Sequence, residues 1–285
     1  MIKKILIRFF AYAVIFYLAL SCSVYFMQWR ILYPATGEVS SVEDAKKLVS
    51  GVQEYLIDIA QEPKDKDDKK VSEDKIRIFY APSKNGKTIV LYYGNRKTMA
   101  DSIKDAKAYY DLGYGLLACS YPGYDGNPGP ANAKRLYSAV SSCLDFLNNE
   151  KKIKDNDIIV HGHSLGGHMA VYAAQNRGFY AVILLAPLGS ALDIARSKYP
   201  YLPVALILQD HLVSYDMAKN ITAPVFLAHN IKDSVVPYRQ GLKIYNNVRS
   251  KKKFLKTIDY LLPGDNGHGN IYSYEIRPDI VRFLK

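Results

Sequence analysis

The chain has 285 residues, of which 49% are hydrophobic, and its 38 Lys and Arg residues outnumber its 27 Asp and Glu residues to give a formal net charge of +11. The basic residues occur in short solvated runs, at 64–70, 151–154 and 251–253, without the interleaved aromatic residues of a nucleic-acid-binding module. Three cysteines do not indicate a disulfide framework, and the chain contains no internal repeat or extended low-complexity segment.

The first informative segment is the uncharged run at residues 9–29. At about 1.5 Å per residue, a helix of this length extends about 31 Å, which matches a hydrocarbon core of roughly 30 Å. Lys3, Lys4 and Arg8 precede the run and favour a cytoplasmic N-terminus. We therefore expect residues 1–30 to be a transmembrane anchor or signal segment, and residues 31–285 to form one domain outside the cytoplasm.

Two other fates of this segment remain open. Ala19 and Ser21 stand before Cys22, so cleavage followed by lipidation of Cys22 is an alternative in a bacterial source, and simple secretion is another. Both an anchor and a lipidated Cys22 would keep the protein at a membrane.

Short apolar runs alternate with helix-forming segments through the rest of the chain. Strands are expected at 76–80, 88–93, 116–120, 158–160, 181–185, 225–228 and 257–262, and helices at 131–149, 165–176, 238–248 and 271–284. This alternation predicts an α/β fold with a mostly parallel sheet that helices cover on both faces.

Residues 189–219 interrupt the alternation and are expected to form a short cap. Their apolar side chains could line a ligand pocket or simply pack against the core. They are Tyr199, Tyr201, Leu202, Val204, Leu206 and Leu208.

The pentapeptide Gly162-His163-Ser164-Leu165-Gly166 follows the β-branched run at 158–160 and precedes a mostly apolar, helix-forming segment. A serine between two glycines at such a strand-to-helix turn is typical of a nucleophile elbow, in which the glycines avoid collisions that Cβ atoms would cause. A bare Gly-x-Ser-x-Gly arises often by chance, but the context favours Ser164 as a nucleophile.

Serine needs a basic partner and a carboxylate to orient that base. Asp233 lies in a loop after the strand-like run at 225–228, and His268 lies in a glycine-rich loop after the run that ends at 262. Both loops leave the carboxyl ends of expected strands, in the order Ser, Asp, His. Asp233 is the predicted acid and His268 the predicted base, with Asp216 as the alternative acid.

The remaining histidines and the cysteines are expected to be structural. His161 and His229 lie at strand ends, His163 fills the variable position of the elbow, and His168 faces helix packing or solvent. None has the spacing of a zinc site. Cys119 and Cys143 are expected to be buried free thiols.

From about residue 30 to its C-terminus, the chain resembles the alpha/beta-hydrolase superfamily, and within it the membrane-anchored serine hydrolases related to bacterial esterases and eukaryotic protein depalmitoylases. The motifs that carry the resemblance are the elbow, Tyr92-Tyr93-Gly94-Asn95, Tyr121-Pro122-Gly123-Tyr124-Asp125-Gly126-Asn127, Asp233-x-x-Val236-Pro237 and Gly267-His268-Gly269. The family usually has His at the position of Tyr93 and Arg at the position of Pro122.

The resemblance implies an alpha/beta-hydrolase fold and acyl transfer through Ser164, His268 and Asp233, with the backbone N–H groups of Asn95 and Leu165 as the oxyanion hole. It implies an ester or thioester substrate, either a lipid or an acylated protein, and no metal or organic cofactor. A serine peptidase on the same fold and a non-catalytic membrane-bound binding protein are the alternatives.

Overall fold

A computed structural model describes residues 2–59 and 75–285. Its centre is an eight-stranded sheet with the order β1-β2-β4-β3-β5-β6-β7-β8. The strands are β1 Gln53–Asp58, β2 Lys75–Ala81, β3 Thr88–Tyr92, β4 Gly115–Cys119, β5 Ile158–His163, β6 Ala181–Leu185, β7 Val225–Asn230 and β8 Lys253–Ile258. Among the pairings of these described strands, only β1–β2 and β2–β4 are antiparallel, so the predicted α/β class with a mostly parallel sheet is confirmed.

The central strands form where the chain is continuously apolar. Every residue of β3, β4, β5, β6 and β7 is buried, as expected for parallel strands that are covered on both faces. The charged run at 64–70, predicted to be solvated, lies outside the described residues.

The prediction of the last strand at 257–262 was wrong by about four residues. β8 pairs in parallel with β7, from Val225 opposite Lys253 to Asn230 opposite Ile258, so hydrogen-bonding partners fix its extent. Residues 259–262 pass beyond the end of β7 and continue as a loop. The edge strand β1 was not predicted, because half of its residues are polar and most of them are exposed.

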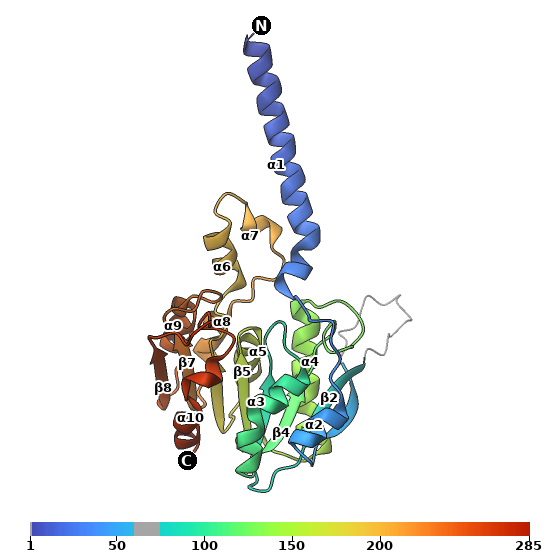
Figure 1. The fold of residues 1–285 in the computed structure, drawn as a ribbon, viewed down its shortest axis with the longest axis vertical. Helices are drawn as coiled ribbons and strands as arrows, with labels where there is room; N and C mark the ends of the chain where they lie inside the picture. Colours follow the sequence, from blue (N-terminus) through green and yellow to red (C-terminus); the bar gives the residue numbers. More distant parts are fainter. Residues whose placement is uncertain (1, 60–74) are drawn as a thin grey trace.

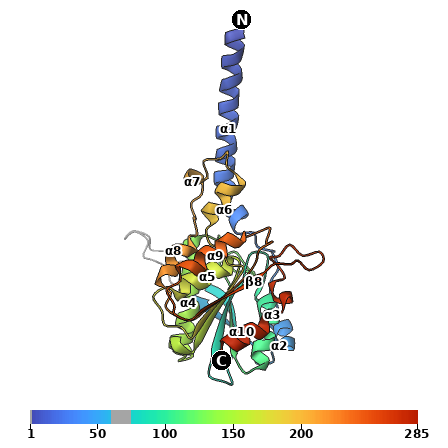
Figure 2. The same ribbon diagram turned by 90° about the vertical axis from the view of Figure 1, so that its left-hand side faces the viewer.

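Helices cover both faces of the sheet, as predicted. Figure 2 shows α4 Ala133–Asp145, α5 Leu165–Ala174, α8 Ser214–Met217 and α9 Tyr238–Asn247 on one side, with α2 Val42–Leu48, α3 Met99–Asp111 and α10 Arg277–Phe283 on the other. The short helical segments are η1 Phe146–Glu150, η2 Asp155–Asp157, η3 Ala218–Asn220 and η4 Ile271–Tyr274.

Three of the predicted helices are confirmed near their expected positions, and the fourth is divided. The expected helix at 271–284 is split into η4 and α10, because Glu275 between them has a left-handed backbone with φ 56°. Pro278 then occupies the first turn of α10, where its missing N–H costs nothing. Helix α3 was not predicted, and its N-terminus carries a capping box formed by Thr98 and Asp101.

Helix α1, Ile2–Leu32, projects away from the domain (Figure 1), and α6 Ala191–Lys198 and α7 Val204–Ile207 lie beside its C-terminal part. By its length and composition, α1 is the one candidate membrane span within the described residues. Its 31 residues would extend about 46 Å, more than a hydrocarbon core of roughly 30 Å requires.

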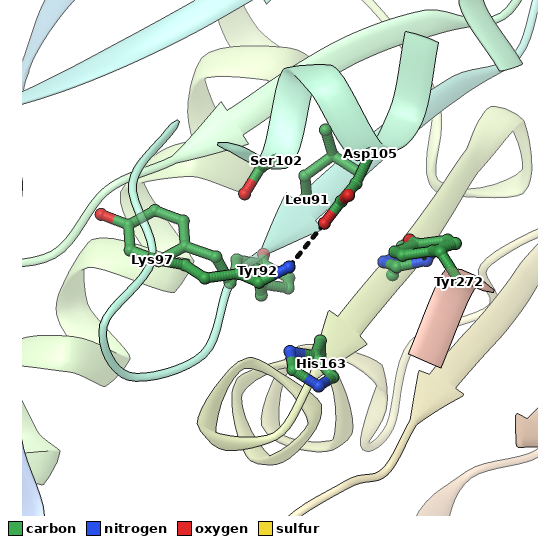
Figure 3. Close-up of a pocket in the computed structure, with 9 residues that line it drawn as sticks. Leu91, Tyr92, Lys97, Ser102, Asp105, His163 and Tyr272 are labelled. Carbon is green, nitrogen blue, oxygen red and sulfur yellow. Dashed lines mark hydrogen bonds and ion pairs between the residues drawn. The ribbon is translucent and has the colours of Figure 1, made fainter. Parts of the chain in front are cut away.

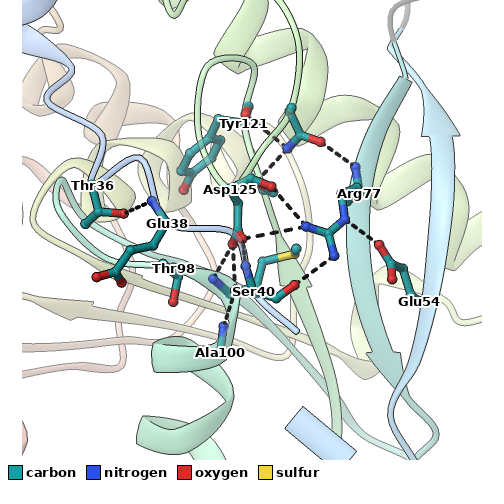
Figure 4. A network of polar contacts seen from close by, with 12 residues as sticks. Thr36, Glu38, Ser40, Glu54, Arg77, Thr98, Ala100, Tyr121 and Asp125 are labelled. Atoms are coloured by element: carbon teal, nitrogen blue, oxygen red, sulfur yellow. Dashed lines mark hydrogen bonds and ion pairs between the residues drawn. The ribbon is translucent and has the colours of Figure 1, made fainter. Parts of the chain in front are cut away.

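A buried carboxylate fastens the segment after α1 to the domain (Figure 4). The side chain of Asp125 accepts hydrogen bonds from the backbone N–H of Ser40 at 2.5 Å and of Met99 at 2.6 Å. Arg77 on β2 donates to the backbone carbonyls of Ser40 and Asp125 and pairs with Glu54. This network joins the 33–40 segment, the start of α3 and the loop after β4, so the base of α1 has a fixed place on the domain.

The prediction of free thiols at Cys119 and Cys143 was wrong. The two form a disulfide between the end of β4 and α4, with their Cα atoms 6.3 Å apart. Their separation of 24 residues carries no pairing signal in sequence, because only the packing of α4 on β4 brings them together. Cys22 on α1 is free and exposed.

Candidate active site

Ser164 lies at the sharp turn from β5 into α5, as predicted. Its backbone has φ 56° and ψ −119°, a combination that costs a non-glycine residue free energy and is held here by surrounding hydrogen bonds. Its N–H donates to the Leu185 carbonyl at 3.1 Å, and its own carbonyl accepts from the N–H groups of Gly167 and Leu188. The turn leaves the hydroxyl of Ser164 directed away from the strand.

The glycines of the elbow are required by close backbone packing. A Cβ on Gly162 would lie 2.1 Å from the Gly166 carbonyl oxygen, and one on Gly166 would lie 1.9 Å from the Tyr92 carbonyl oxygen. A Cβ on Gly94, in the loop after β3, would lie 2.9 Å from the Cβ of Ser164. The elbow therefore packs closely against β3, and Ser164 packs against the loop after β3 that carries the predicted oxyanion donor.

The structure brings Ser164, His268 and Asp233 together. The His268 Nε2 atom is 2.8 Å from the Ser164 Oγ atom, and the His268 Nδ1 atom is 2.7 Å from an Asp233 carboxylate oxygen. An ionised Asp233 can only accept, so Nδ1 carries the proton and Nε2 accepts from the serine hydroxyl. In this arrangement, His268 can take the serine proton while Asp233 fixes the orientation of the imidazole.

Asp233 is held as an anion by several donors. Its Oδ1 atom accepts from the N–H groups of Val235 at 2.9 Å and Val236 at 2.8 Å. Burial alone would raise the pKa of Asp233, but hydrogen bonds from His229 and His268 outweigh it and lower the pKa to about 2. The alternative acid, Asp216, is exposed and pairs with Lys219, away from these residues.

The depressed pKa of Asp233 predicts a defined pH dependence of stability. Because the folded-state value of about 2 lies below the ordinary 3.8, the ionised group stabilises the fold above about pH 4 and loses this effect as the pH falls towards 2. Asp233→Asn should therefore lower the free energy of unfolding by about 2 kcal/mol near pH 6, and the difference from the parent should shrink between pH 4 and 2.

Denaturant unfolding of the detergent-solubilised proteins across this pH range measures the difference. Asp216→Asn is the matched control, because an exposed pair contributes at most about 1 kcal/mol. A difference between parent and Asp233→Asn that stays constant down to pH 2 would contradict the assignment of an ionised, hydrogen-bonded Asp233.

The two predicted oxyanion donors lie on either side of the serine. Leu165 is the first residue of α5, where the backbone N–H lacks a helical acceptor. The N–H of Asn95 follows Gly94, which packs on the Ser164 Cβ atom. The Asn95 side chain donates to the Leu32 carbonyl at 2.9 Å and accepts from the Tyr124 hydroxyl at 2.6 Å, so both ends of its amide are fixed.

The residue that departs from the family pattern, Tyr93, is part of the floor of this loop. Its buried ring lies 5.0 Å from that of Tyr121, centre to centre, and its hydroxyl is 2.7 Å from the Ser120 Oγ atom. Tyr93 therefore stabilises, through packing, the loop that carries Asn95, one of the two predicted oxyanion donors.

Two histidines that were expected to be structural, His163 and His229, contact the site. The Nε2 atom of His163 donates to the His268 carbonyl at 2.9 Å, and burial holds the pKa of His163 well below its ordinary value, which keeps it neutral. His229 donates to the Val236 carbonyl at 2.9 Å and lies 3.3 Å from the Asp233 carboxylate. His163 thus orients the loop of the base, and His229 orients the loop of the acid. The only sign of these roles in the sequence was that His163 lies within the elbow and His229 lies shortly before Asp233.

His161 and His168 are buried, and their hydrogen-bond partners are Tyr272 for His161 and Tyr137 and Ser214 for His168, all outside the series formed by Ser164, His268 and Asp233. His161 lies beside a cavity of about 20 Å³ (Figure 3), which also contains the Lys97–Asp105 ion pair at 2.6 Å. Burial lowers the pKa of His161 to about 3, so it is neutral and hydrogen-bonded to the Tyr272 hydroxyl. This cavity is too small for a substrate. Within residues 2–59 and 75–285, no group of three or more His, Cys, Asp and Glu side chains could hold a metal ion.

Comparison with known proteins extends these observations. The model of the prolyl oligopeptidase family matches residues 131–284. An uncharacterized protein of Mycobacterium tuberculosis is 26% identical over 171 residues, which cover 60% of this chain and 61% of the relative. Alpha/beta hydrolase domain-containing protein 17C of Homo sapiens is 26% identical over 163 residues, which cover 56% of this chain and 45% of that protein. The chain thus matches less than two thirds of the length of either relative.

Solved structures show the same fold. An esterase of Pyrococcus furiosus superposes with a TM-score of 0.67 at 15% identity, covering 87% of this chain and 94% of the esterase. An acetyl xylan esterase from Paenibacillus sp. R4 gives a TM-score of 0.59 at 17% identity, covering 90% of this chain and 98% of that enzyme. The predicted alpha/beta-hydrolase fold is therefore confirmed.

Proposed function

Because the chain belongs to the prolyl oligopeptidase family, within the alpha/beta-hydrolase superfamily, we propose that it is a membrane-anchored serine hydrolase that cleaves carboxylic ester or thioester bonds. The observation that carries this proposal is the hydrogen-bonded series from Asp233 through His268 to Ser164, at 2.7 Å and 2.8 Å. Both distances lie in the range of roughly 2.6–3.2 Å that proton transfer needs.

The proposed reaction proceeds through an acyl-enzyme. The Ser164 Oγ atom attacks the substrate carbonyl carbon while its proton passes to His268, and the N–H groups of Asn95 and Leu165 bind the resulting oxyanion. The intermediate collapses as His268 returns the proton to the leaving alcohol or thiol. A water molecule, deprotonated by His268, then attacks the acyl group, which releases the carboxylic acid and restores Ser164.

The proposed location is a membrane, with residues 1–30 as the anchor, residues 31–285 as the catalytic domain and residues 189–219 as its cap. The length of α1 and the basic residues before its apolar part support an anchor with a cytoplasmic N-terminus. The disulfide between Cys119 and Cys143 supports an oxidising compartment for the domain, because such bonds persist mainly outside the cytosol. Lipidation at Cys22 is the alternative attachment.

A peptidase is the second candidate, because the family takes its name from an oligopeptidase. We favour esters and thioesters because the cap residues near α1 are uncharged and largely apolar from Tyr199 to Leu208, which suits an acyl group better than an extended polar peptide. The non-catalytic alternative would require the three site residues to lie out of mutual reach, and the two hydrogen bonds of the series count against it.

A substrate panel tests the proposal on the full-length protein in detergent. We expect kcat/KM for p-nitrophenyl butyrate and for butyryl thiocholine to exceed that for a prolyl-peptide p-nitroanilide by at least a factor of about 10, equivalent to about 1.4 kcal/mol of barrier. A preference for the anilide would identify a peptidase instead. Failure of a folded protein to hydrolyse any member of the panel would contradict catalysis.

A further inference from the structure

The cap, residues 189–219, contacts the apolar helix α1 at positions from Tyr17 to Gln28. Near its tip, the Tyr201 carbonyl accepts a hydrogen bond of 3.0 Å from the hydroxyl of Tyr17. Further along α1, the buried side chain of Gln28 donates to the Ile207 carbonyl at 3.1 Å and accepts from the Gln209 N–H at 2.8 Å. Tyr17 and Gln28 are about 16 Å apart along a helix axis, so the contact extends over that length.

With α1 as the proposed anchor, these contacts put Tyr201 at the depth of the lipid chains. Tyr17 lies about 12 Å from the start of the uncharged run at 9–29 and about 18 Å from its end, which is near the middle of the span. If α1 were shifted along its axis until Tyr17 lay outside the hydrocarbon core, only residues 2–16 would remain to cross it. They form about 22 Å of helix and include three basic residues, which is too short and too charged for a core of roughly 30 Å. The cap therefore has to share the bilayer with α1.

The composition of the cap fits that location. Residues 199–209 contain no charge, whereas Arg196 and Lys198 precede them and Asp210 follows. Leu206 is 85% exposed and Tyr201 is 64% exposed. Pro200 and Pro203 have no N–H group, and the N–H groups of Leu202, Leu206 and Leu208 bond within the cap, which reduces the cost of placing this backbone in lipid.

A cavity of about 160 Å³ lies between the two elements. Its lining is almost wholly apolar and includes Val24, Ile31 and Leu32 of α1 with Tyr199, Leu202 and Leu208 of the cap. The amide side chain in the lining, Gln28, uses both of its ends in the bonds to the cap. The Leu32 carbonyl accepts the hydrogen bond from Asn95, so one wall of the cavity adjoins the oxyanion loop.

We propose that residues 199–208 enter the membrane leaflet beside α1, and that the cavity between them binds one acyl chain of a glycerophospholipid whose ester carbonyl reaches Ser164. This rests on the proposed function and specifies its substrate. We choose a phospholipid as the occupant because α1 and the cap form the cavity within the leaflet. Phospholipid acyl chains surround the cavity there and can enter it. The substrate enters sideways from the bilayer and carries its ester group towards the oxyanion loop.

Substrate chain length tests the cavity. Ala195 on α6 lines it, so Ala195→Phe should fill part of it and lower kcat/KM for p-nitrophenyl palmitate relative to p-nitrophenyl acetate by about 10-fold, equivalent to about 1.4 kcal/mol. Leu206→Phe is the matched control, because Leu206 lies on the cap but points outward, and it should keep the parental ratio. An unchanged ratio in Ala195→Phe would overturn the cavity assignment. If the parent hydrolysed neither ester, the proposed function itself would fail.

Depth and occupant have their own tests, both on the Ser164→Ala protein in nanodiscs. Trp29 is the single tryptophan of the chain, so Leu206→Trp combined with Trp29→Phe reports on the cap alone. We expect quenching by phosphatidylcholine brominated on its acyl chains, and quenching by aqueous iodide instead would overturn insertion.

The occupant is tested by crosslinking. A phosphatidylcholine with a diazirine on its acyl chain should crosslink to the cavity residues of the Ser164→Ala protein, and this crosslink should be lost when Ala195→Phe is added. Crosslinking only by a diazirine-labelled S-acyl peptide would overturn the phospholipid assignment.

Discussion

Ser164→Ala should lower kcat for ester hydrolysis by about 10⁴-fold to 10⁶-fold, the range typical for loss of a serine nucleophile. Within the described residues, the hydroxyl of Ser164 makes one hydrogen bond, to His268, so its removal takes away the attacking atom and leaves the turn intact. The backbone bonds of Ser164 to Leu185, Gly167 and Leu188 do not involve the side chain. The free energy of unfolding of the variant should therefore lie within about 1 kcal/mol of that of the parent.

The measurement is steady-state hydrolysis of p-nitrophenyl butyrate, together with denaturant unfolding of both proteins. Ser83→Ala is a suitable control, because Ser83 lies in the turn between β2 and β3, at the edge of the sheet opposite Ser164, and its loss should leave kcat unchanged. A Ser164→Ala protein with more than a tenth of the parental kcat would place the nucleophile elsewhere.

Gly166→Ala should prevent the protein from folding or destabilise it by more than about 4 kcal/mol, a size reached only by a few mechanisms such as severe steric conflict. The added Cβ would lie 1.9 Å from the Tyr92 carbonyl oxygen and 2.3 Å from its carbonyl carbon. These atoms belong to the backbone of β3 in the centre of the sheet, so neither a rotamer change nor a small loop shift can relieve the contact.

Gly178→Ala is the matched control, because a Cβ there meets no atom within 4 Å and Gly178 does not have a positive φ. Denaturant unfolding in detergent, with yield of monodisperse protein as a second readout, compares the two variants. A Gly166→Ala protein as stable as Gly178→Ala would mean that α5 does not pack against β3 as described.

The sheet centre could be predicted from sequence because strands buried on both faces are continuous apolar runs. The strand at 181–185 was predicted with the observed bounds. The edge of the sheet could not be predicted in this way, since β1 is mostly exposed and half polar, and the extent of β8 depends on its pairing with β7. The local pattern of apolar residues locates a strand that is buried on both faces. It does not locate the ends of a strand when those ends depend on pairing with a neighbouring strand.

The site followed from the order of motifs at strand ends, which brings Ser164, Asp233 and His268 to one edge of a parallel sheet. The roles of His163 and His229 depend on loops that fold back from distant parts of the chain, and so does the pairing of Cys119 with Cys143. The contact of the cap with α1 joins residues more than 170 positions apart, such as Gln28 and Ile207, and no local pattern announces it.

Reaction with a fluorophosphonate probe tests most directly whether Ser164 is an activated nucleophile. Labelling of the detergent-solubilised parent, followed by peptide mass mapping, should find one adduct on Ser164, and the adduct should be absent from Ser164→Ala and strongly reduced in His268→Gln. A folded parent that takes up no probe, or an adduct on another serine that persists in Ser164→Ala, would contradict the account.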